Sequence, residues 1–161
     1  MRVRIFLALA AVCAAAAACE SNDPVGPTCA DATSTVQGKS GDTTTTKSGL
    51  RYIDLRAGTG AAVGACSSVA IHYTLYLNGT AVDSLRDPRY GYFVTPGERP
   101  ARTIEGVAEG VLGLRVGSVR RLIIPPALGY GSTDRVDPQT KKVVVPANST
   151  LVFDLEVLQV Q

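Results

Sequence analysis

The sequence predicts one α+β domain, in which a curved antiparallel sheet is half-wrapped around one short helix. Several short runs of residues alternate between apolar and polar, which is the pattern of half-buried strands. One segment near residue 110 has its apolar residues at helical spacing instead. Because the strands outnumber the helix and do not alternate with helices, the helix is expected to cover one face of the sheet.

The first strands of the domain surround a recognisable turn. Residues 50–58 (LRYIDLRAG) mix strand-forming residues and end at turn-forming glycines, which predicts a first strand. In residues 67–79 (SSVAIHYTLYLNG), the odd-numbered positions from 71 to 77 are aliphatic or aromatic and lie on one face. Asn78-Gly79 is a preferred two-residue hairpin turn because both positions tolerate positive φ, so residues 80–84 form the return strand.

A change of period predicts the helix. Val107, Val111 and Leu114 fall at i, i+4 and i+7, on one face of a helix that ends near Gly117. Three glycines lie inside this segment, and each costs about 1 kcal/mol relative to alanine in a helix interior. We therefore expect a short helix that is held by packing against the sheet.

Two strands and a polar loop follow the helix. Residues 118–124 (SVRRLII) predict a strand that Pro125-Pro126 terminates. The loop beyond it is rich in polar and turn-forming residues and leads to a short apolar run at 143–145. In residues 151–160, alternate positions are aliphatic or aromatic and the opposite face carries acids, which indicates a half-buried antiparallel strand.

Residues 1–18 have the layout of a secretory signal, with Arg2 and Arg4 before an apolar run that is shorter than the roughly 20 residues of a membrane span. Small residues precede Cys19, as in a bacterial lipoprotein signal, where the cysteine is acylated and becomes the new N-terminus. An ordinary signal peptidase site after the alanines is the alternative. We favour the lipoprotein, although Ala16 stands where a leucine is usual.

The remaining chain divides into a tether and a domain. Residues 19–48 are rich in Thr, Ser, Gly, Asp and Pro and cannot bury enough apolar surface to offset the entropy of ordering, so we interpret them as a flexible tether. Residues 49–161 form the single domain. The chain has a formal net charge of +2, and loss of the two signal arginines leaves the mature form neutral, which argues against a nucleic-acid surface.

The cysteines fit an exported protein. Cleavage removes Cys13 and lipid occupies Cys19, which leaves Cys29 and Cys66 as an even pair in an oxidising compartment. We predict a disulfide between them, which restricts the unfolded chain and stabilises the fold by roughly 3 to 4 kcal/mol. Two unrelated thiols are the alternative.

The sequence lacks the patterns of several kinds of enzyme. His72 is the only histidine and points to the opposite face of its strand from Tyr73, so we interpret it as a structural residue rather than the base of a hydrolase. There is no Cys/His cluster with ligand spacing and no P-loop, so no metal and no cofactor are predicted. What remains is a set of aromatic and branched residues that fits either an ordinary core or an apolar binding pocket.

Three motifs occur in an order that resembles the FKBP-type peptidyl-prolyl isomerase domain. They are VAIHYTLYLNGTAVDS, IEGVAEGVLGLRVGSVRRLIIPPALGYG and VPANSTLVFDLEVL, and together they cover about residues 69–160. The resemblance implies a half-conical antiparallel sheet around a short helix, with a shallow prolyl pocket between the two. It also implies a catalytic group and a substrate-binding group of residues. The catalytic group is Tyr73, Asp83, Tyr130 and Phe153, and the substrate-binding group is Val82, Tyr92, Thr103, Ile104, Val107 and Val145.

By the same resemblance, the hydroxyl of Tyr73 pairs with Asp83, and Tyr130 and the backbone at Thr103-Ile104 hold the peptide. The chain departs from the family pattern in four ways. Val107 replaces a tryptophan on the pocket floor, Val82 replaces an aromatic residue, Leu75 replaces a glycine, and the segment TPGERPARTIEG is about two residues longer than usual. Lost ring surface costs on the order of 1 to 2 kcal/mol per ring, so we expect weaker proline binding and a reduced rate.

The function that follows is isomerisation of Xaa-Pro bonds in exported proteins, by apolar stabilisation of the twisted amide and without a cofactor or a covalent intermediate. The expected partners are proline-containing polypeptides and macrolide-type inhibitors. We expect a monomer in the bacterial cell envelope or periplasm, with Cys19 as its only membrane attachment. The alternatives are a proline-peptide-binding chaperone module with little or no turnover, and a structural lipoprotein that shares only the fold.

Overall fold

The computed structural model describes residues 41–98 and 101–161, which form a seven-stranded sheet, a two-stranded hairpin, one α-helix and one short 3-10 helix. The elements are β1 (Thr43–Thr45), β2 (Arg51–Arg56), β3 (Val69–Leu77), β4 (Thr80–Leu85), β5 (Tyr92–Val94), α1 (Glu105–Val111), β6 (Val119–Ile124), the short 3-10 helix η1 (Pro126–Leu128), β7 (Arg135–Val136), β8 (Val143–Val145) and β9 (Leu151–Val160).

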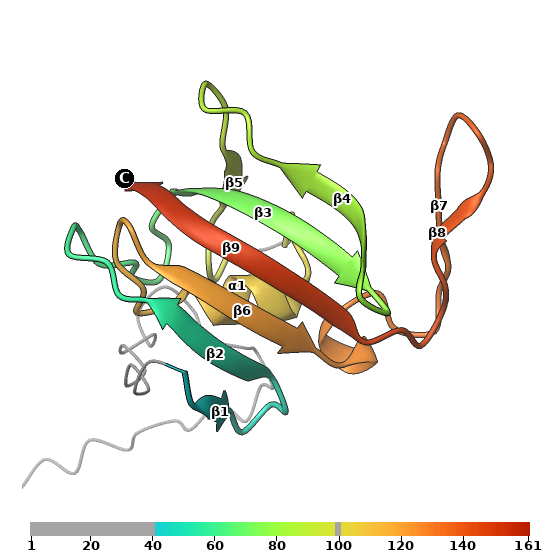
Figure 1. The fold of residues 1–161 in the computed structure, drawn as a ribbon, viewed down its shortest axis with the longest axis horizontal. Helices are drawn as coiled ribbons and strands as arrows, with labels where there is room; N and C mark the ends of the chain where they lie inside the picture. The colour runs from blue at the N-terminus through green and yellow to red at the C-terminus, as the bar shows by residue number, and fades with distance from the viewer. Residues whose placement is uncertain (1–40, 99–100) are drawn as a thin grey trace, which may run out of the picture.

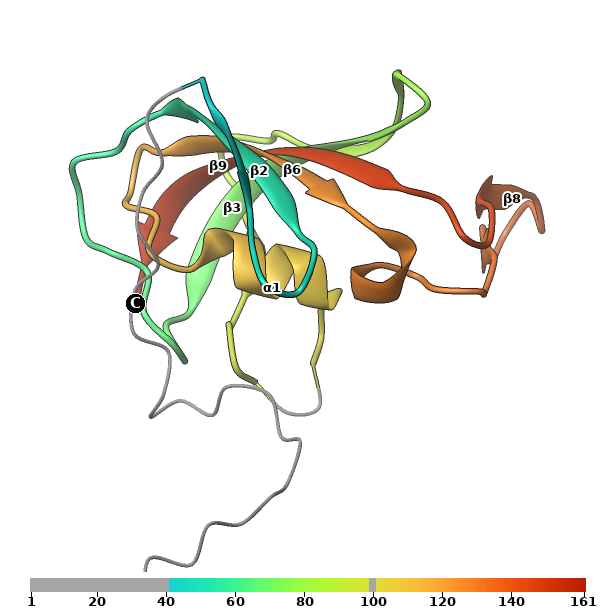
Figure 2. The ribbon, with the colours of Figure 1, turned by 90° about the horizontal axis from the view of Figure 1, so that it is seen from below.

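The main sheet is antiparallel throughout, in the order β1-β2-β6-β9-β3-β4, and β5 pairs with the first residues of β3. The long strands β9 and β3 lie side by side at its centre, as Figure 1 shows. Figure 2 shows α1 beneath the concave face of this curved sheet. The α+β class expected from the sequence is therefore confirmed. A separate hairpin, β7–β8, projects from one end of the domain.

The hairpin between β3 and β4 turns where the Asn-Gly dipeptide predicts. Asn78 and Gly79 have φ of 50° and 81°, both in the left-handed region. The register then sets Leu75 opposite Asp83, with an irregularity between Leu75 and Tyr76. This turn brings Asp83 back alongside the residues of β3 that face the concave side.

The glycines of α1 allow the helix to lie close to the sheet. A Cβ added at Gly106 would lie 2.5 Å from Cγ2 of Ile124, and one added at Gly110 would lie 2.5 Å from Cδ1 of Leu122. Both neighbours belong to β6 and are fully buried. Glycine lowers the helical propensity of this segment, but only a residue without a side chain lets the helix pack this close to β6.

The helix ends earlier than the sequence predicts. Its last residue is Val111 rather than one near Gly117, because Leu112 already has an extended ψ of 136° and Gly113 has φ of 73°. Leu114 lies beyond the end of the helix but is only 1% exposed, so the apolar spacing predicted its burial correctly. A left-handed glycine is a common helix terminator, and this one outweighs the continued apolar spacing.

Ordered structure begins inside the segment that we predict to be a tether. β1 forms from Thr43–Thr45, pairs with β2 and so corrects the expectation that residues 19–48 lack structure to their end. The physical reason is that threonine favours strands and that β2 offers a free edge. The predicted signal, Cys19 and Cys29 lie outside the described residues. Within the residues that the structure describes, no helix is long and apolar enough to span a membrane.

A buried ion pair fixes the helix to the sheet. Arg120 on β6 donates from Nε and Nη2 to the two carboxylate oxygens of Asp54, at 2.6 and 3.1 Å. Its Nη1 donates to the backbone oxygen of Gly110 at 2.9 Å, and its guanidinium lies 3.9 Å from the ring centroid of Tyr52. One side chain thus joins β6, β2 and α1, and its charge is compensated where it is buried.

We expect the substitution Gly106→Ala to destabilise the domain by about 1 to 3 kcal/mol, because the new methyl group overlaps a branched side chain that cannot swing away. Urea unfolding measures this change. Gly64→Ala is the matched control, since a Cβ there meets nothing closer than Oγ of Ser67 at 3.6 Å. If the Gly106 variant is as stable as the wild type, then the close approach does not constrain the fold.

Candidate functional site

A pocket of about 420 Å³ opens between the concave face of the sheet and the start of α1. Its walls come from β3, β9, β4 and β5, from the segment before the helix, and from the region after η1. The lining residues are Ile71, Tyr73, Leu75, Asp83, Tyr92, Ala101, Arg102, Thr103, Ile104, Val107, Tyr130, Arg135 and Phe153.

Three aromatic rings form one wall. Alternation along β3 points Tyr73 to the concave side, and the register sets Phe153 of β9 opposite Leu75. The Tyr73 ring meets that of Tyr92 edge-on, with centroids 5.7 Å apart and an interplanar angle of 76°. It meets that of Phe153 at 5.8 Å. Such contacts stabilise ring pairs beyond area burial alone, so this wall is well defined.

The hydroxyl of Tyr73 is hydrogen-bonded to Asp83. It donates to Oδ2 of the carboxylate at 2.9 Å, which is the pairing that the sequence predicts. Burial raises the pKa of the Tyr73 phenol, and the hydrogen bond to the Asp83 carboxylate and its negative charge raise it further. The phenol therefore stays protonated throughout the ordinary pH range and does not act as a base.

The floor and one rim come from the start of the helix. Val107, in the first turn of α1, is 3% exposed and lies at the bottom of the pocket. The preceding residues Thr103 and Ile104 form the rim. The hydroxyl of Tyr92 donates to the backbone oxygen of Arg102 at 3.3 Å, which ties this rim to β5.

Tyr130 and Arg135 also line the pocket. Tyr130 follows η1, and the guanidinium carbon of Arg135 lies 5.0 Å from its ring centroid. A cation at this distance from a ring face is attracted by the ring quadrupole. Among the described residues, no group of three or more His, Cys, Asp or Glu side chains is arranged to hold a metal.

The pocket brings together eight of the ten residues that the resemblance implies. Val82 and Val145 are the exceptions. Val145 is 3% exposed and belongs to the core, and Val82 packs against that core from β4. A valine side chain is too short to extend from this position into the pocket as an aromatic ring does. His72 lies outside the pocket, with Nε2 2.9 Å from the backbone oxygen of Asp87, as its place on β3 predicts.

Sequence reasoning missed five lining residues. Ile71 and Leu75 share the strand parity of Tyr73 and could have been found by that signal. Ala101 and Arg102 directly precede Thr103, which the resemblance does implicate. Arg135 lies in a polar loop whose folding has no periodic signal, so only the structure places it at the pocket.

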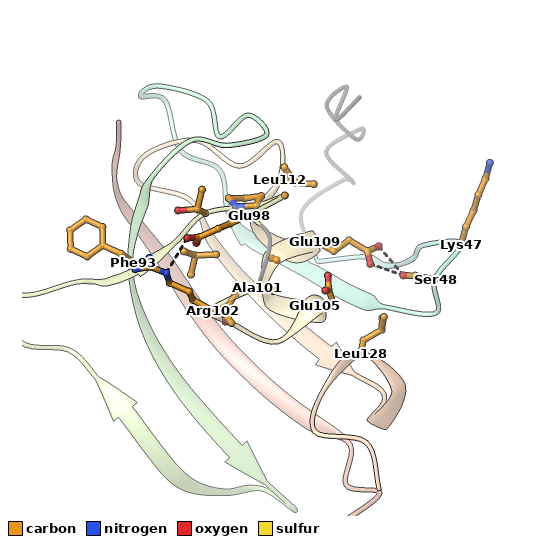
Figure 3. A pocket seen from close by; sticks show the side chains of 16 residues that line it. Lys47, Ser48, Phe93, Glu98, Ala101, Arg102, Glu105, Glu109, Leu112 and Leu128 are labelled. Atoms are coloured by element: carbon orange, nitrogen blue, oxygen red, sulfur yellow. Dashed lines mark hydrogen bonds and ion pairs between the residues drawn. The ribbon is translucent and has the colours of Figure 1, made fainter. Parts of the chain in front are cut away.

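A second cavity, of about 570 Å³, lies on the other side of the 101–103 segment and is shown in Figure 3. Its charged side chains make contacts within the domain. Glu98 pairs with Arg102 at 3.0 Å, and the carboxylate of Glu109 accepts from the hydroxyl of Ser48 at 2.7 and 2.9 Å. The contact of Glu109 joins α1 to the turn after β1, and that of Glu98 holds Arg102, which lines both pockets.

The curved antiparallel sheet, the short α-helix across its concave face and the aromatic pocket between them match the architecture that the three sequence motifs imply. The chain belongs to the FKBP-type peptidyl-prolyl cis-trans isomerase family, whose model matches residues 60–158. This match confirms the family resemblance of the three sequence motifs.

Individual relatives agree with the family match. The chain is 35% identical to the chloroplastic peptidyl-prolyl cis-trans isomerase FKBP16-4 of Arabidopsis thaliana, over 74% of this chain and 52% of that protein, so it spans about half the length of this relative. It is 35% identical to an FK506-binding protein of Neisseria meningitidis, over 70% of this chain and 96% of that one. The crystal structure of FkpA from Escherichia coli superposes with a TM-score of 0.61 at 30% identity, over 76% of this chain and 53% of that one.

The substitution Asp83→Ala should lower the pKa of Tyr73 toward its ordinary value, because the carboxylate no longer accepts from the phenol or repels the phenolate. Burial remains, so the pKa should stay above the ordinary value. A pH titration of ring-labelled tyrosine by NMR measures it. Asp42→Ala removes the same charge from an exposed position outside the pocket and serves as control; an unchanged Tyr73 titration in the Asp83 variant would contradict the pairing.

Proposed function

We propose that the domain catalyses cis-trans isomerisation of Xaa-Pro bonds, with the proline ring seated in the aromatic pocket. The observation that carries this proposal is the wall of Tyr73, Tyr92 and Phe153 above the apolar floor at Val107, in a chain of this family. The peptide bond rotates over a barrier of about 18 to 20 kcal/mol, and no bond need be broken to lower it.

The pocket favours the twisted amide over the planar one. A planar amide is stabilised by resonance and by water around its large dipole, and the twisted form has lost much of both. Contact with an apolar wall removes water from the amide. The planar amide loses more hydration free energy by this than the twisted amide does, because its dipole is larger. The barrier therefore falls by differential binding, with neither a cofactor nor a covalent intermediate.

Two groups can hold the peptide while its amide rotates. Tyr130 lines the pocket, so its phenol can donate to a carbonyl of the bound chain. The backbone N–H of Ile104 precedes α1 and is bonded to no other described residue, so it can donate to the bound chain as well. Tyr73 and Asp83 act differently, because their mutual hydrogen bond fixes the shape of the wall.

We expect the isomerisation rate to be lower than that of a pocket with aromatic residues at positions 82 and 107. Val107 supplies less contact surface to a proline than an aromatic floor, and Val82 lies outside the pocket. The family match favours catalysis over the binding-module alternative.

We also propose that the protein is exported to the cell envelope and anchored there by lipid at Cys19. We propose a disulfide between Cys29 and Cys66. The protein is proposed to work as a monomer on proline-containing polypeptides. The signal-like residues 1–18 support export. The bridge is supported by Cys66, which is disulfide-bonded. The name of the Neisseria relative, an FK506-binding protein, supports macrolide-type inhibitors as further ligands.

An exchange measurement on a proline peptide tests the activity. We expect catalysed cis-trans exchange by NMR at micromolar protein, and a fall in kcat/KM of about two- to tenfold in Tyr130→Phe, the value of one lost hydrogen bond. Tyr90→Phe is the matched control, because Tyr90 is 63% exposed and lies outside the pocket. Absence of exchange above the uncatalysed rate would refute the isomerase, and an active but unaltered Tyr130 variant would remove that hydroxyl from the mechanism.

Mass spectrometry of the mature protein from a bacterial envelope tests the export proposal. We expect an N-terminus at Cys19 that carries the mass of acyl chains, and no reactive thiol in the unfolded, unreduced protein. A Cys19→Ser variant should lose the added mass and leave the membrane fraction. A mature chain that retains residues 1–18 would refute export, and two titratable thiols would refute the bridge.

A further inference from the structure

Arg135 contributes a charge to the pocket that the mechanism above does not use. The pocket has three charged lining residues. Asp83 accepts from Tyr73, and Arg102 pairs with Glu98 at 3.0 Å, so both are engaged within the domain. Within the described part of the chain, the side chain of Arg135 forms no ion pair, and its guanidinium lies over the ring of Tyr130.

The β7–β8 hairpin holds Arg135 in this place from several sides. Arg135 pairs with Val145, whose side chain is 3% exposed in the core, so the base of the hairpin is anchored. Asp134 beside it accepts from the backbone N–H of Ala147 at 2.6 Å, and the N–H of Asn148 donates to the oxygen of Gly131 at 2.7 Å. The backbone of Arg135 is therefore fixed beside the pocket, and the ring of Tyr130 attracts its guanidinium.

We propose that Arg135 is a specificity-determining residue that selects polypeptides with an acidic residue directly before or after the proline. An arginine fork matches the two oxygens of a carboxylate, and such a side chain next to a seated proline lies at the pocket edge where Arg135 stands. A lysine at the same place would be repelled. The inference rests on the proposed prolyl isomerase function and adds a substrate preference to it.

Two peptide series test this preference. One is acetyl-Ala-Xaa-Pro-Phe-amide and the other acetyl-Ala-Ala-Pro-Xaa-amide, each with Xaa as Glu, Gln or Lys and with uncharged ends. In at least one series, we expect kcat/KM for Glu to exceed that for Gln by about two- to fivefold, which is the range of an exposed ion pair, and Lys to fall below Gln. The preference should shrink between about 0.02 M and about 0.5 M salt.

Variants assign the preference to Arg135. Arg135→Gln should bring the Glu-to-Gln ratio close to one, and Arg135→Glu should make Lys the better substrate. Arg51→Gln is the matched control, because Arg51 is exposed on β2, which β6 and β9 separate from β3, and it should keep the wild-type ratios. The readout is a ratio between substrates, so a general loss of activity does not mimic it.

The outcomes separate this inference from the isomerase function. If the wild type accelerates all three peptides of each series equally, or if Arg135→Gln lowers every rate and keeps the ratios, the charge selection is refuted while the isomerase stands. If the wild type accelerates none, the isomerase function fails. In that case, the dissociation constants of the same peptides, measured by NMR titration, test the charge selection. Tighter binding of the Glu peptide that is lost in Arg135→Gln would support the selection, and equal affinities would refute it.

Discussion

The close contact between α1 and β6 is the constraint on which the rest of the structure depends. Gly106 and Gly110 present no side chain to the sheet, so the helix can lie directly against Ile124 and Leu122. Arg120 then bonds the backbone of Gly110 from the sheet side. A helix of seven residues has little stability of its own, so these contacts, rather than helical propensity, determine where it lies.

The pocket follows from that placement. Because the helix crosses the concave face so closely, its first turn becomes a floor, and the residues before it become a rim. The aromatic wall needs a second constraint, because the ring of Tyr73 must be held in contact with the rings of both Tyr92 and Phe153. The hairpin at Asn78-Gly79 supplies it by returning Asp83 to the hydroxyl of Tyr73. The site therefore combines one helix–sheet contact with one tight turn.

The sequence predicts those features of the fold that local rules govern, and it fails where distant segments meet. Alternation identifies β3 and β9, and positive φ explains the turn, because each depends only on neighbouring residues. The Tyr73–Asp83 pair follows from that turn and from the resemblance. By contrast, the place of Val82 outside the pocket depends on side-chain length, and that of Arg135 depends on how a polar loop docks through Val145. Neither has a periodic signal.

If Arg135 selects substrates as proposed, the rim of this pocket discriminates between substrates more than its interior does. In the proposed mode of binding, the aromatic wall and Val107 contact the proline ring itself, so they do not distinguish between its neighbours in the peptide. With valine at 107, fewer ring contacts hold the proline, and each remaining contact supplies a larger share of the binding free energy. Arg135 stands on a hairpin outside the main sheet, so a change of charge there need not disturb the aromatic wall. Substrate preference can therefore change by loop substitution while the catalytic wall is retained.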